Sequence, residues 1–269
     1  MTTRALLAAD KVTKRFRATG PGAQTVTALD GVSLELRHGE TLAVVGESGS
    51  GKSTLARIML DLLRPDDGRV LFDGKDVASL RGRDRMQFRR AAQIVFQDPF
   101  SSLNPRLSVG TIVGEPLAIH SIGDRAERRR RVAAALEAVG LSASDAARAP
   151  HAFSGGQRQR IAIARALILE PQAVLLDEPL SALDVTIQRQ ILTLLAEIKQ
   201  RRKLTYLFIT HDLGVARAIA DRIAVMHRGR IVELGPTESV FTAPEQRYTR
   251  ELIAAVPVLG GPLRIGAPQ

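Results

Sequence analysis

The sequence has 269 residues, of which 45% are hydrophobic and 25% charged, the composition of an ordinary globular protein. It contains no cysteine, which excludes disulfides, thiolate metal sites and cysteine-ligated iron–sulfur clusters. The net charge of +10 favours anionic partners such as a nucleotide, a nucleic acid or an acidic membrane surface. With two tyrosines and no tryptophan, however, the chain lacks aromatic platforms for single-stranded nucleic acid, so we expect no nucleic-acid partner. Because it has no membrane-length apolar run and no signal-peptide pattern, we expect it in the cytosol or docked on a membrane protein.

The N-terminal part of the chain predicts short β-strands. Residues 1–40 contain strand-like stretches that are interrupted by the Gly-Pro-Gly sequence at 20–22. Residues 66–75 combine an apolar run with the turn residues Asp73-Gly74, which is the pattern of a hairpin. We therefore expect these two ranges to form a small antiparallel β subdomain.

The next stretch has the pattern of a phosphate-binding loop. Residues 41–45 are an apolar run typical of a buried parallel strand, and apolar residues at helical spacing begin at Leu55. Between them, the sequence GESGSGKS at residues 46–53 matches G-x-x-x-x-G-K-[ST]. Its glycines would let backbone N–H groups wrap a phosphate chain, while Lys52 would reach the outer phosphates and Ser53 would offer its hydroxyl to Mg²⁺. A glycine-rich connection that binds nothing is disfavoured because strand, loop and helix follow in order, so the sequence predicts a nucleotide site.

A helical region follows a second core-like strand. Residues 92–96 predict that strand, which ends at Gln97. Strand signals then stop, so we expect residues 98–159 to be an inserted helical subdomain. Four arginines at residues 128–131 precede an apolar stripe at helical spacing, and we interpret them as a solvated helix face.

Predicted strands return in the second half of the chain, at residues 173–177, 205–209 and 222–226. A strongly periodic helix is predicted between the first and second of these strands. Alternation of strand and helix implies a mostly parallel sheet covered on both faces. Residues 41–97 and 160–235 would then form the nucleotide-binding core. Residues 236–269 are rich in proline and glycine, and we expect them to be an appendage with little core of its own.

Two carboxylates follow the predicted strand at residues 173–177, at the sheet edge where such folds bind their ligands. Asp177 would hold Mg²⁺ through water, and Glu178 would polarise the attacking water as a general base. An acidic pair after a core strand is often only a surface feature. The phosphate loop in the same chain favours the catalytic interpretation.

A second helix start suited to an anion lies at Ser154-Gly155-Gly156-Gln157. Ser154 can cap the helix that follows, and the two glycines allow an anion to approach closely. Alone, this sequence would predict a helix start and nothing more. In a chain that already has one phosphate loop, it suggests that the second helix start serves the nucleotide of another subunit.

Taken in order, these motifs resemble the ATP-binding subunit of an ABC transporter. The resemblance rests on the phosphate loop, Gln97, FSGGQRQR at 153–160, LDEP at 176–179, SALD at 181–184 and THD at 210–212. It implies an α/β fold with a phosphate-loop (RecA-like), mostly parallel core, an antiparallel β subdomain and an inserted α-helical subdomain. All three parts would belong to one ABC ATPase domain of residues 1–235, followed by the tail of residues 236–269.

The resemblance also implies an ATP site. The nucleotide would be bound by the loop residues Gly46, Glu47, Ser48, Gly49, Ser50, Gly51, Lys52, Ser53 and Thr54. Phe16 would stack on the adenine, although a lone phenylalanine is more often a core aromatic. Ser53, Gln97 and Asp177 would contact Mg²⁺, and Gln97 would couple the site to the helical subdomain.

The catalytic and cross-subunit roles follow from the same resemblance. Glu178, His211, Gln97 and Lys52 would act in hydrolysis, and His211 would hold the γ-phosphate and the water. Alone, His211 would more often be a strand-end histidine with a local partner. The residues that would close over the γ-phosphate of the opposite subunit are Ser154, Gly155, Gly156 and Gln157, with Asp184 at the subunit interface.

The implied mechanism is dimeric. Two cassettes, either copies or paralogues, would sandwich two ATP molecules, and hydrolysis would release the sandwich. The helical subdomain would transmit this motion to two membrane-spanning permease subunits at the cytoplasmic face of the inner membrane. An extracytoplasmic solute-binding protein would be only an indirect partner.

A narrower resemblance is to the oligopeptide, dipeptide and nickel importer branch. It rests on FQDPFSSLNP at 96–105, SALDV at 181–185 and YTRELIAAVP at 248–257. The chain departs from this branch at Arg247, where many relatives have proline, and in its short, cysteine-free tail. The alternative is a soluble or assembly-type ABC ATPase without a role in transport. The soluble type usually carries two cassettes or a long coiled-coil or zinc insertion, which this chain lacks, whereas an assembly role stays open.

Overall fold

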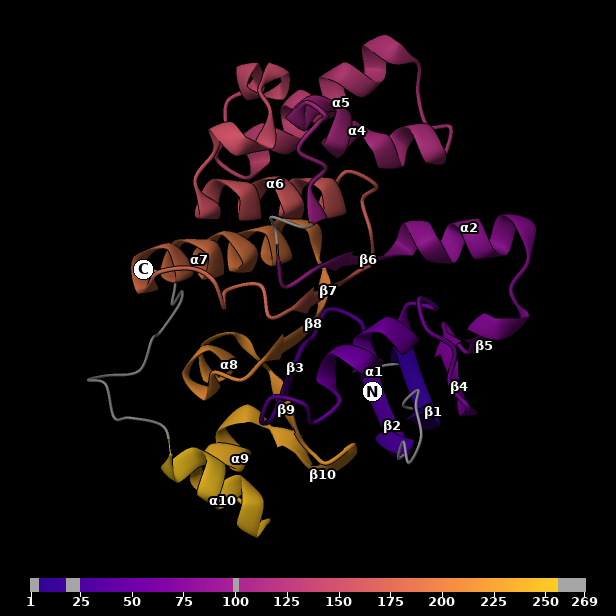
Figure 1. The fold of residues 1–269 in the computed structure, drawn as a ribbon, viewed down its shortest axis with the longest axis vertical. Helices are drawn as coiled ribbons and strands as arrows, with labels where there is room; N and C mark the ends of the chain where they lie inside the picture. Colours follow the sequence, from indigo (N-terminus) through magenta and orange to yellow (C-terminus); the bar gives the residue numbers. More distant parts are fainter. Residues whose placement is uncertain (1–4, 18–24, 99–101, 256–269) are drawn as a thin grey trace.

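The computed structural model describes residues 5–17, 25–98 and 102–255. These residues form a four-stranded antiparallel sheet and a six-stranded, mostly parallel sheet with helices on both faces (Figure 1). The predicted α/β fold class is therefore confirmed. The Gly-Pro-Gly interruption predicted at residues 20–22 lies outside the described residues.

The antiparallel sheet has the strand order β2-β1-β4-β5, with β1 (Ala5–Arg17), β2 (Thr25–Arg37), β4 (Asp67–Phe72) and β5 (Lys75–Asp76). Asp73 and Gly74 both have positive φ, 50° and 82°, and join β4 to β5 in a two-residue turn, as the sequence predicted. β1 and β2 are each 13 residues long, so the prediction of short strands is wrong here. Register shifts between these strands break the alternation of apolar and polar residues, and long strands therefore look short in the sequence.

The second sheet has the strand order β10-β9-β3-β8-β7-β6. Its strands are β3 (Thr41–Val45), β6 (Ala92–Val95), β7 (Ala173–Asp177), β8 (Thr205–Thr210), β9 (Arg222–His227) and β10 (Arg230–Pro236). Only β10 runs antiparallel to its neighbour. Every residue of β3, β7 and β8 is buried, which explains why these strands are continuous apolar runs in the sequence.

The two faces of the sheet bury alternate side chains of each strand. On β8, Tyr206 and Phe208 face one apolar cluster, to which α6 (Gly155–Leu167) and α7 (Val185–Arg202) contribute. Leu207 and Ile209 face the other cluster, which joins α1 (Lys52–Met59) to the antiparallel sheet. The core strands are thus covered on both faces, and their carboxyl ends are left open.

The helical part of the chain stacks on α6 and α7, on the side away from the antiparallel sheet (Figure 1). It contains α4 (Val109–Ile119), α5 (Arg125–Ala138), and short 3₁₀ turns at Ala143–Ala147 and Pro150–Ala152. On α5, Val132, Ala135 and Leu136 are buried, whereas Arg129 and Arg130 are exposed. Two of the four arginines are thus solvated as interpreted, whereas Arg128 and Arg131 are half-buried, with Arg128 donating to the Ile122 carbonyl and Arg131 paired with Glu127.

The sequence did not predict α2 (Gly82–Ala91), which follows a 3₁₀ turn at Val77–Ser79. This helix is rich in arginine and has one buried side chain, Phe88, so it has no apolar periodicity to detect. Phe88 packs edge-on against Phe72 of β4, with ring centroids 5.2 Å apart. This aromatic contact therefore helps to join the helix to the antiparallel sheet.

The described part of the predicted tail forms α9 (Thr237–Thr242) and α10 (Arg247–Ala254) after β10, whereas α8 (Leu213–Ile219) precedes β9. In these tail helices Val240 is buried, and Tyr248, Leu252 and Ile253 pack on the same apolar cluster as Ala43 and Val45 of β3. The described tail therefore has little core of its own, and its short helices pack on the core of the preceding domain. Residues 256–269 lie outside the described residues.

Within the described ranges, no helix is both long enough and apolar enough to span a membrane.

Phe88→Ala should lower the free energy of unfolding by about 3–5 kcal/mol, because a fully buried aromatic ring is lost from the core. Phe16→Ala is the matched control, since Phe16 is 43% exposed and should cost far less. Urea denaturation of the three proteins measures both effects. Equal losses in the two variants would contradict the assigned packing of α2.

Candidate active site

The loop of residues 46–51 connects the carboxyl end of β3 to α1, as the sequence predicted. Gly46 and Gly51 have φ of 151° and 108°. A Cβ atom would lie 2.1 Å from the carbonyl oxygen of Met226 at Gly46, and 2.4 Å from that of Ala28 at Gly51. Glycine is therefore required at both positions by backbone geometry and by the close approach of neighbouring strands.

The side chain of Lys52, the first residue of α1, folds back onto this loop. Its ammonium group donates hydrogen bonds to the carbonyl oxygens of Gly46 and Glu47, each 2.8 Å away. Burial lowers the pKa of this ammonium group, while the carboxylates of Glu178 and Asp177 act in the opposite direction. The loop thus presents a buried cation together with the free N–H groups at the start of α1, an arrangement suited to phosphate.

Ser53 and Asp177 form the second polar pair of the site. The Ser53 hydroxyl donates to Asp177 Oδ1 at 2.8 Å. Burial raises the pKa of the Asp177 carboxyl, which is only 3% exposed, and the hydrogen bond from Ser53 partly offsets this. A buried carboxylate beside a hydroxyl is an oxygen donor set that fits Mg²⁺. Because the described residues contain no cluster of three or more His, Cys, Asp or Glu side chains suited to a metal, the remaining oxygens would come from phosphate and water.

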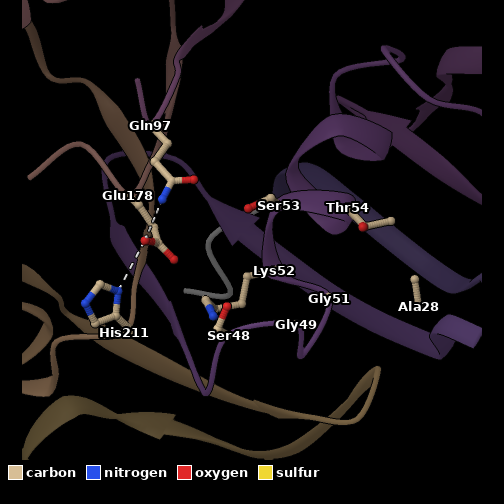
Figure 2. A pocket seen from close by; sticks show the side chains of 10 residues that line it. All are labelled: Ala28, Ser48, Gly49, Gly51, Lys52, Ser53, Thr54, Gln97, Glu178 and His211. Carbon is tan, nitrogen blue, oxygen red and sulfur yellow. Dashed lines mark hydrogen bonds and ion pairs between the residues drawn. The ribbon is translucent and has the colours of Figure 1, made fainter. Parts of the chain in front are cut away.

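Glu178 lies between two polar side chains above the loop. Gln97 Nε2 donates to Glu178 Oε2 at 3.1 Å, and His211 Nδ1 lies 3.2 Å from the same oxygen (Figure 2). The three residues follow β7, β6 and β8, which are neighbours in the sheet, so their proximity results from the parallel topology. Glu178 also has a positive φ of 44°, a backbone conformation that is uncommon outside glycine.

These groups line one open pocket of about 470 Å³. The predicted site residues that reach it are Ser48, Gly49, Gly51, Lys52, Ser53, Thr54, Gln97, Glu178 and His211. Ala28 on β2 also lines the pocket and was missed, because an alanine carries no chemical signal in a sequence. Asp177 reaches the pocket only through its bond to Ser53.

Three other loop residues, Gly46, Glu47 and Ser50, do not line the pocket and instead contact neighbouring segments of the chain. Gly46 provides the close approach to β9, and the Ser50 carbonyl accepts a hydrogen bond from the Gly229 N–H at 3.0 Å. The Glu47 N–H donates to the hydroxyl of Tyr248 at 3.3 Å. Phe16, predicted to stack on adenine, is 43% exposed on β1 and does not line the pocket.

The second predicted helix start does not reach the pocket either. Ser154 caps α6 in a reciprocal capping box with Gln157, and Asp184 caps α7 by accepting from the Ile187 N–H at 3.0 Å. A Cβ at Gly156 would lie 2.5 Å from Ile187 Cγ2, whereas a Cβ at Gly155 would make only an ordinary contact of 3.6 Å with Leu183. Gly156 is therefore fixed by packing between α6 and α7, while Gly155 is not.

Comparison with known proteins shows the family. The model of the family described as ABC transporter matches residues 29–181. The oligopeptide transport ATP-binding proteins AppF and OppF of Bacillus subtilis are 49% and 48% identical to this chain. Each match covers 87% of this chain, and the two matches cover 71% of AppF and 77% of OppF. The chain belongs to the ABC transporter ATP-binding family, and ATP hydrolysis is the activity expected of it.

Solved structures agree with this assignment. A dimeric structure of the ATP-binding cassette MJ0796 in a post-hydrolysis state, bound to ADP and Pi, has a TM-score of 0.76 and 32% identity over 86% of this chain and 98% of that one. CbiO1 from Clostridium perfringens, described as part of the ABC transporter complex cbiONQ, has the same TM-score and identity over 90% of this chain and 92% of its own.

Gly156→Ala should lower the free energy of unfolding by about 1–3 kcal/mol, because the added methyl group overpacks against Ile187. Gly155→Ala is the matched control in the same helical turn and should change stability by less than about 0.5 kcal/mol. Chemical denaturation of both variants measures the difference. If the two variants are equally stable, the packing assigned to the start of α6 is wrong.

Proposed function

We propose that this chain hydrolyses ATP to energise the import of a small solute through an ABC transporter. The observation that carries the proposal is the Glu178 carboxylate, which lies above the phosphate loop between Gln97 and His211. The names of the similar proteins AppF and OppF favour an oligopeptide as the solute, within the branch that also includes dipeptide and nickel importers.

In this proposal, the loop N–H groups and Lys52 bind the phosphate chain of ATP. Ser53, Asp177 and Gln97 would hold Mg²⁺, which would neutralise phosphate charge. Gln97 fits this role because its amide nitrogen donates a hydrogen bond to Glu178, while its amide oxygen points to the Ser53 side of the pocket (Figure 2). Phe16 remains a candidate for contact with the adenine, although its ring lies outside the pocket wall.

The chemical step is in-line attack of water on the γ-phosphorus. Glu178 accepts the proton of that water as the new P–O bond forms and the bond to ADP breaks. His211 orients the water and contacts the γ-phosphate. Its position 3.2 Å from Glu178 Oε2 supports a shared role of the two side chains on one water molecule.

A second cassette completes the site in this proposal. Ser154, Gly155, Gly156 and Gln157 do not line the pocket of their own chain, and Ser154 and Gln157 are exposed. Gly155 has space on the side away from Leu183, so the α6 start can receive the γ-phosphate held by the other subunit. Asp184, exposed as the cap of α7, would lie at the same interface.

A groove beside the site suits the membrane-spanning partner. It lies among α2, β6, α4 and α6 and includes two exposed apolar side chains, Phe96 and Ile119, which are 37% and 63% exposed. Phe96 directly precedes Gln97, so a partner seated in the groove would act on a residue that touches Glu178. We place one of the two permease subunits in this groove and the other in the matching groove of the second cassette, with both cassettes held peripherally at the cytoplasmic face of the membrane.

Glu178→Gln should bind ATP with nearly unchanged affinity but hydrolyse it about 10²–10⁴-fold more slowly, because the amide cannot accept the proton of the water. Steady-state phosphate release and nucleotide binding to the purified chain measure the two properties. Glu137→Gln is the matched control, since Glu137 is exposed on α5 and does not line the pocket, and its turnover should be that of the unmodified chain. Turnover of Glu178→Gln close to that of the control would contradict the role of Glu178.

A further inference from the structure

The C-terminal helix α10 contacts the phosphate loop directly. The Tyr248 hydroxyl accepts a hydrogen bond from the Glu47 N–H at 3.3 Å. The Tyr248 ring packs on the ring of His227 at the end of β9, with centroids 3.9 Å apart. An aromatic side chain from the tail thus contacts both the loop and the end of the strand on which the loop packs.

The position of Tyr248 is fixed by anchors on both sides of it in the chain. Just before α10, the two carboxylate oxygens of Glu233 on β10 accept from the N–H groups of Glu245 and Gln246, at 2.9 and 3.1 Å. Further along the helix, Leu252 and Ile253 pack against the apolar cluster that contains β3. The helix is therefore docked on the core, and this docking holds Tyr248 against the loop.

One peptide group connects Tyr248 to Lys52. The Gly46 carbonyl and the Glu47 N–H belong to the same planar peptide unit. Its carbonyl oxygen accepts a hydrogen bond from Lys52 Nζ at 2.8 Å, and its N–H donates to Tyr248. Rotation of this peptide would break both bonds, so the tyrosine hydroxyl helps to orient the carbonyl that holds the ammonium group.

We propose that Tyr248 is a positioning residue of the phosphate loop, through which α10 sets the orientation of the Gly46–Glu47 peptide and the placement of Lys52 for ATP. This inference rests on the proposed function. Tyr248 does not line the nucleotide pocket and does not contact Glu178, Gln97 or His211 in the described residues. Its effect is therefore on the binding of ATP and not on the attack of water.

Tyr248→Phe removes the hydroxyl and keeps the ring on His227. The KM for ATP should rise by about two- to tenfold, the size expected for loss of one hydrogen bond, while kcat stays within about twofold. Tyr206→Phe is the matched control, because Tyr206 is the only other tyrosine and its hydroxyl donates to the Leu195 carbonyl in the core at 3.1 Å. The control should lose some thermal stability and keep its KM.

The presence of only two tyrosines also allows a direct spectroscopic test on the full chain. In protein labelled with fluorotyrosine, Tyr206→Phe assigns the two ¹⁹F resonances. Addition of Mg²⁺ and ATP to the Glu178→Gln variant should shift the Tyr248 resonance and leave that of Tyr206 in place. A Tyr248 resonance that does not respond to bound nucleotide, or a KM in Tyr248→Phe equal to that of the unmodified chain, would overturn the inference. Failure of the unmodified chain to bind ATP would instead refute the proposed function.

Discussion

The carboxyl ends of four neighbouring parallel strands, β3, β8, β7 and β6, meet at one edge of the sheet, and the candidate site depends on this alignment. The phosphate loop follows β3, Glu178 follows β7, Gln97 follows β6 and His211 follows β8. Residues separated by more than 100 positions in the chain, such as Gln97 and His211, therefore contact the same carboxylate oxygen. Strand pairing places these side chains, and the loops that follow the strands need only a few residues to complete the site.

The same alignment has an energetic cost. Asp177 is a nearly fully buried carboxyl group whose pKa is raised by burial, and Lys52 is a buried ammonium group whose pKa is lowered by it. Charged groups held away from water destabilise a fold unless a ligand or partner compensates them. In the proposed function, phosphate and Mg²⁺ would compensate these charges. The site then lowers the stability of the ligand-free fold and raises its affinity for ATP.

Much of the core and of the site could be predicted from local sequence patterns. The phosphate loop, the buried strands and the Asp177-Glu178 pair are each continuous in the sequence, and their spacing is set by the geometry of one strand or one helix. Phe88 and Ala28 could not be predicted in the same way. Phe88 is the single buried residue of an arginine-rich helix, and Ala28 lines the pocket through its position on β2 alone. The contact of Tyr248 with Glu47 joins residues 201 positions apart and leaves no local signal.

The central claim is that ATP hydrolysis by this chain is coupled to a membrane partner, and affinity capture from detergent-solubilised native membranes tests it most directly. Mass spectrometry of the captured material should find two polytopic membrane proteins and an ATP-binding cassette, with both membrane proteins lost when Phe96 in the groove is replaced by arginine. Recovery of the chain only from the soluble fraction, without any polytopic protein, would contradict a role in transport. It would not contradict ATP hydrolysis by the chain.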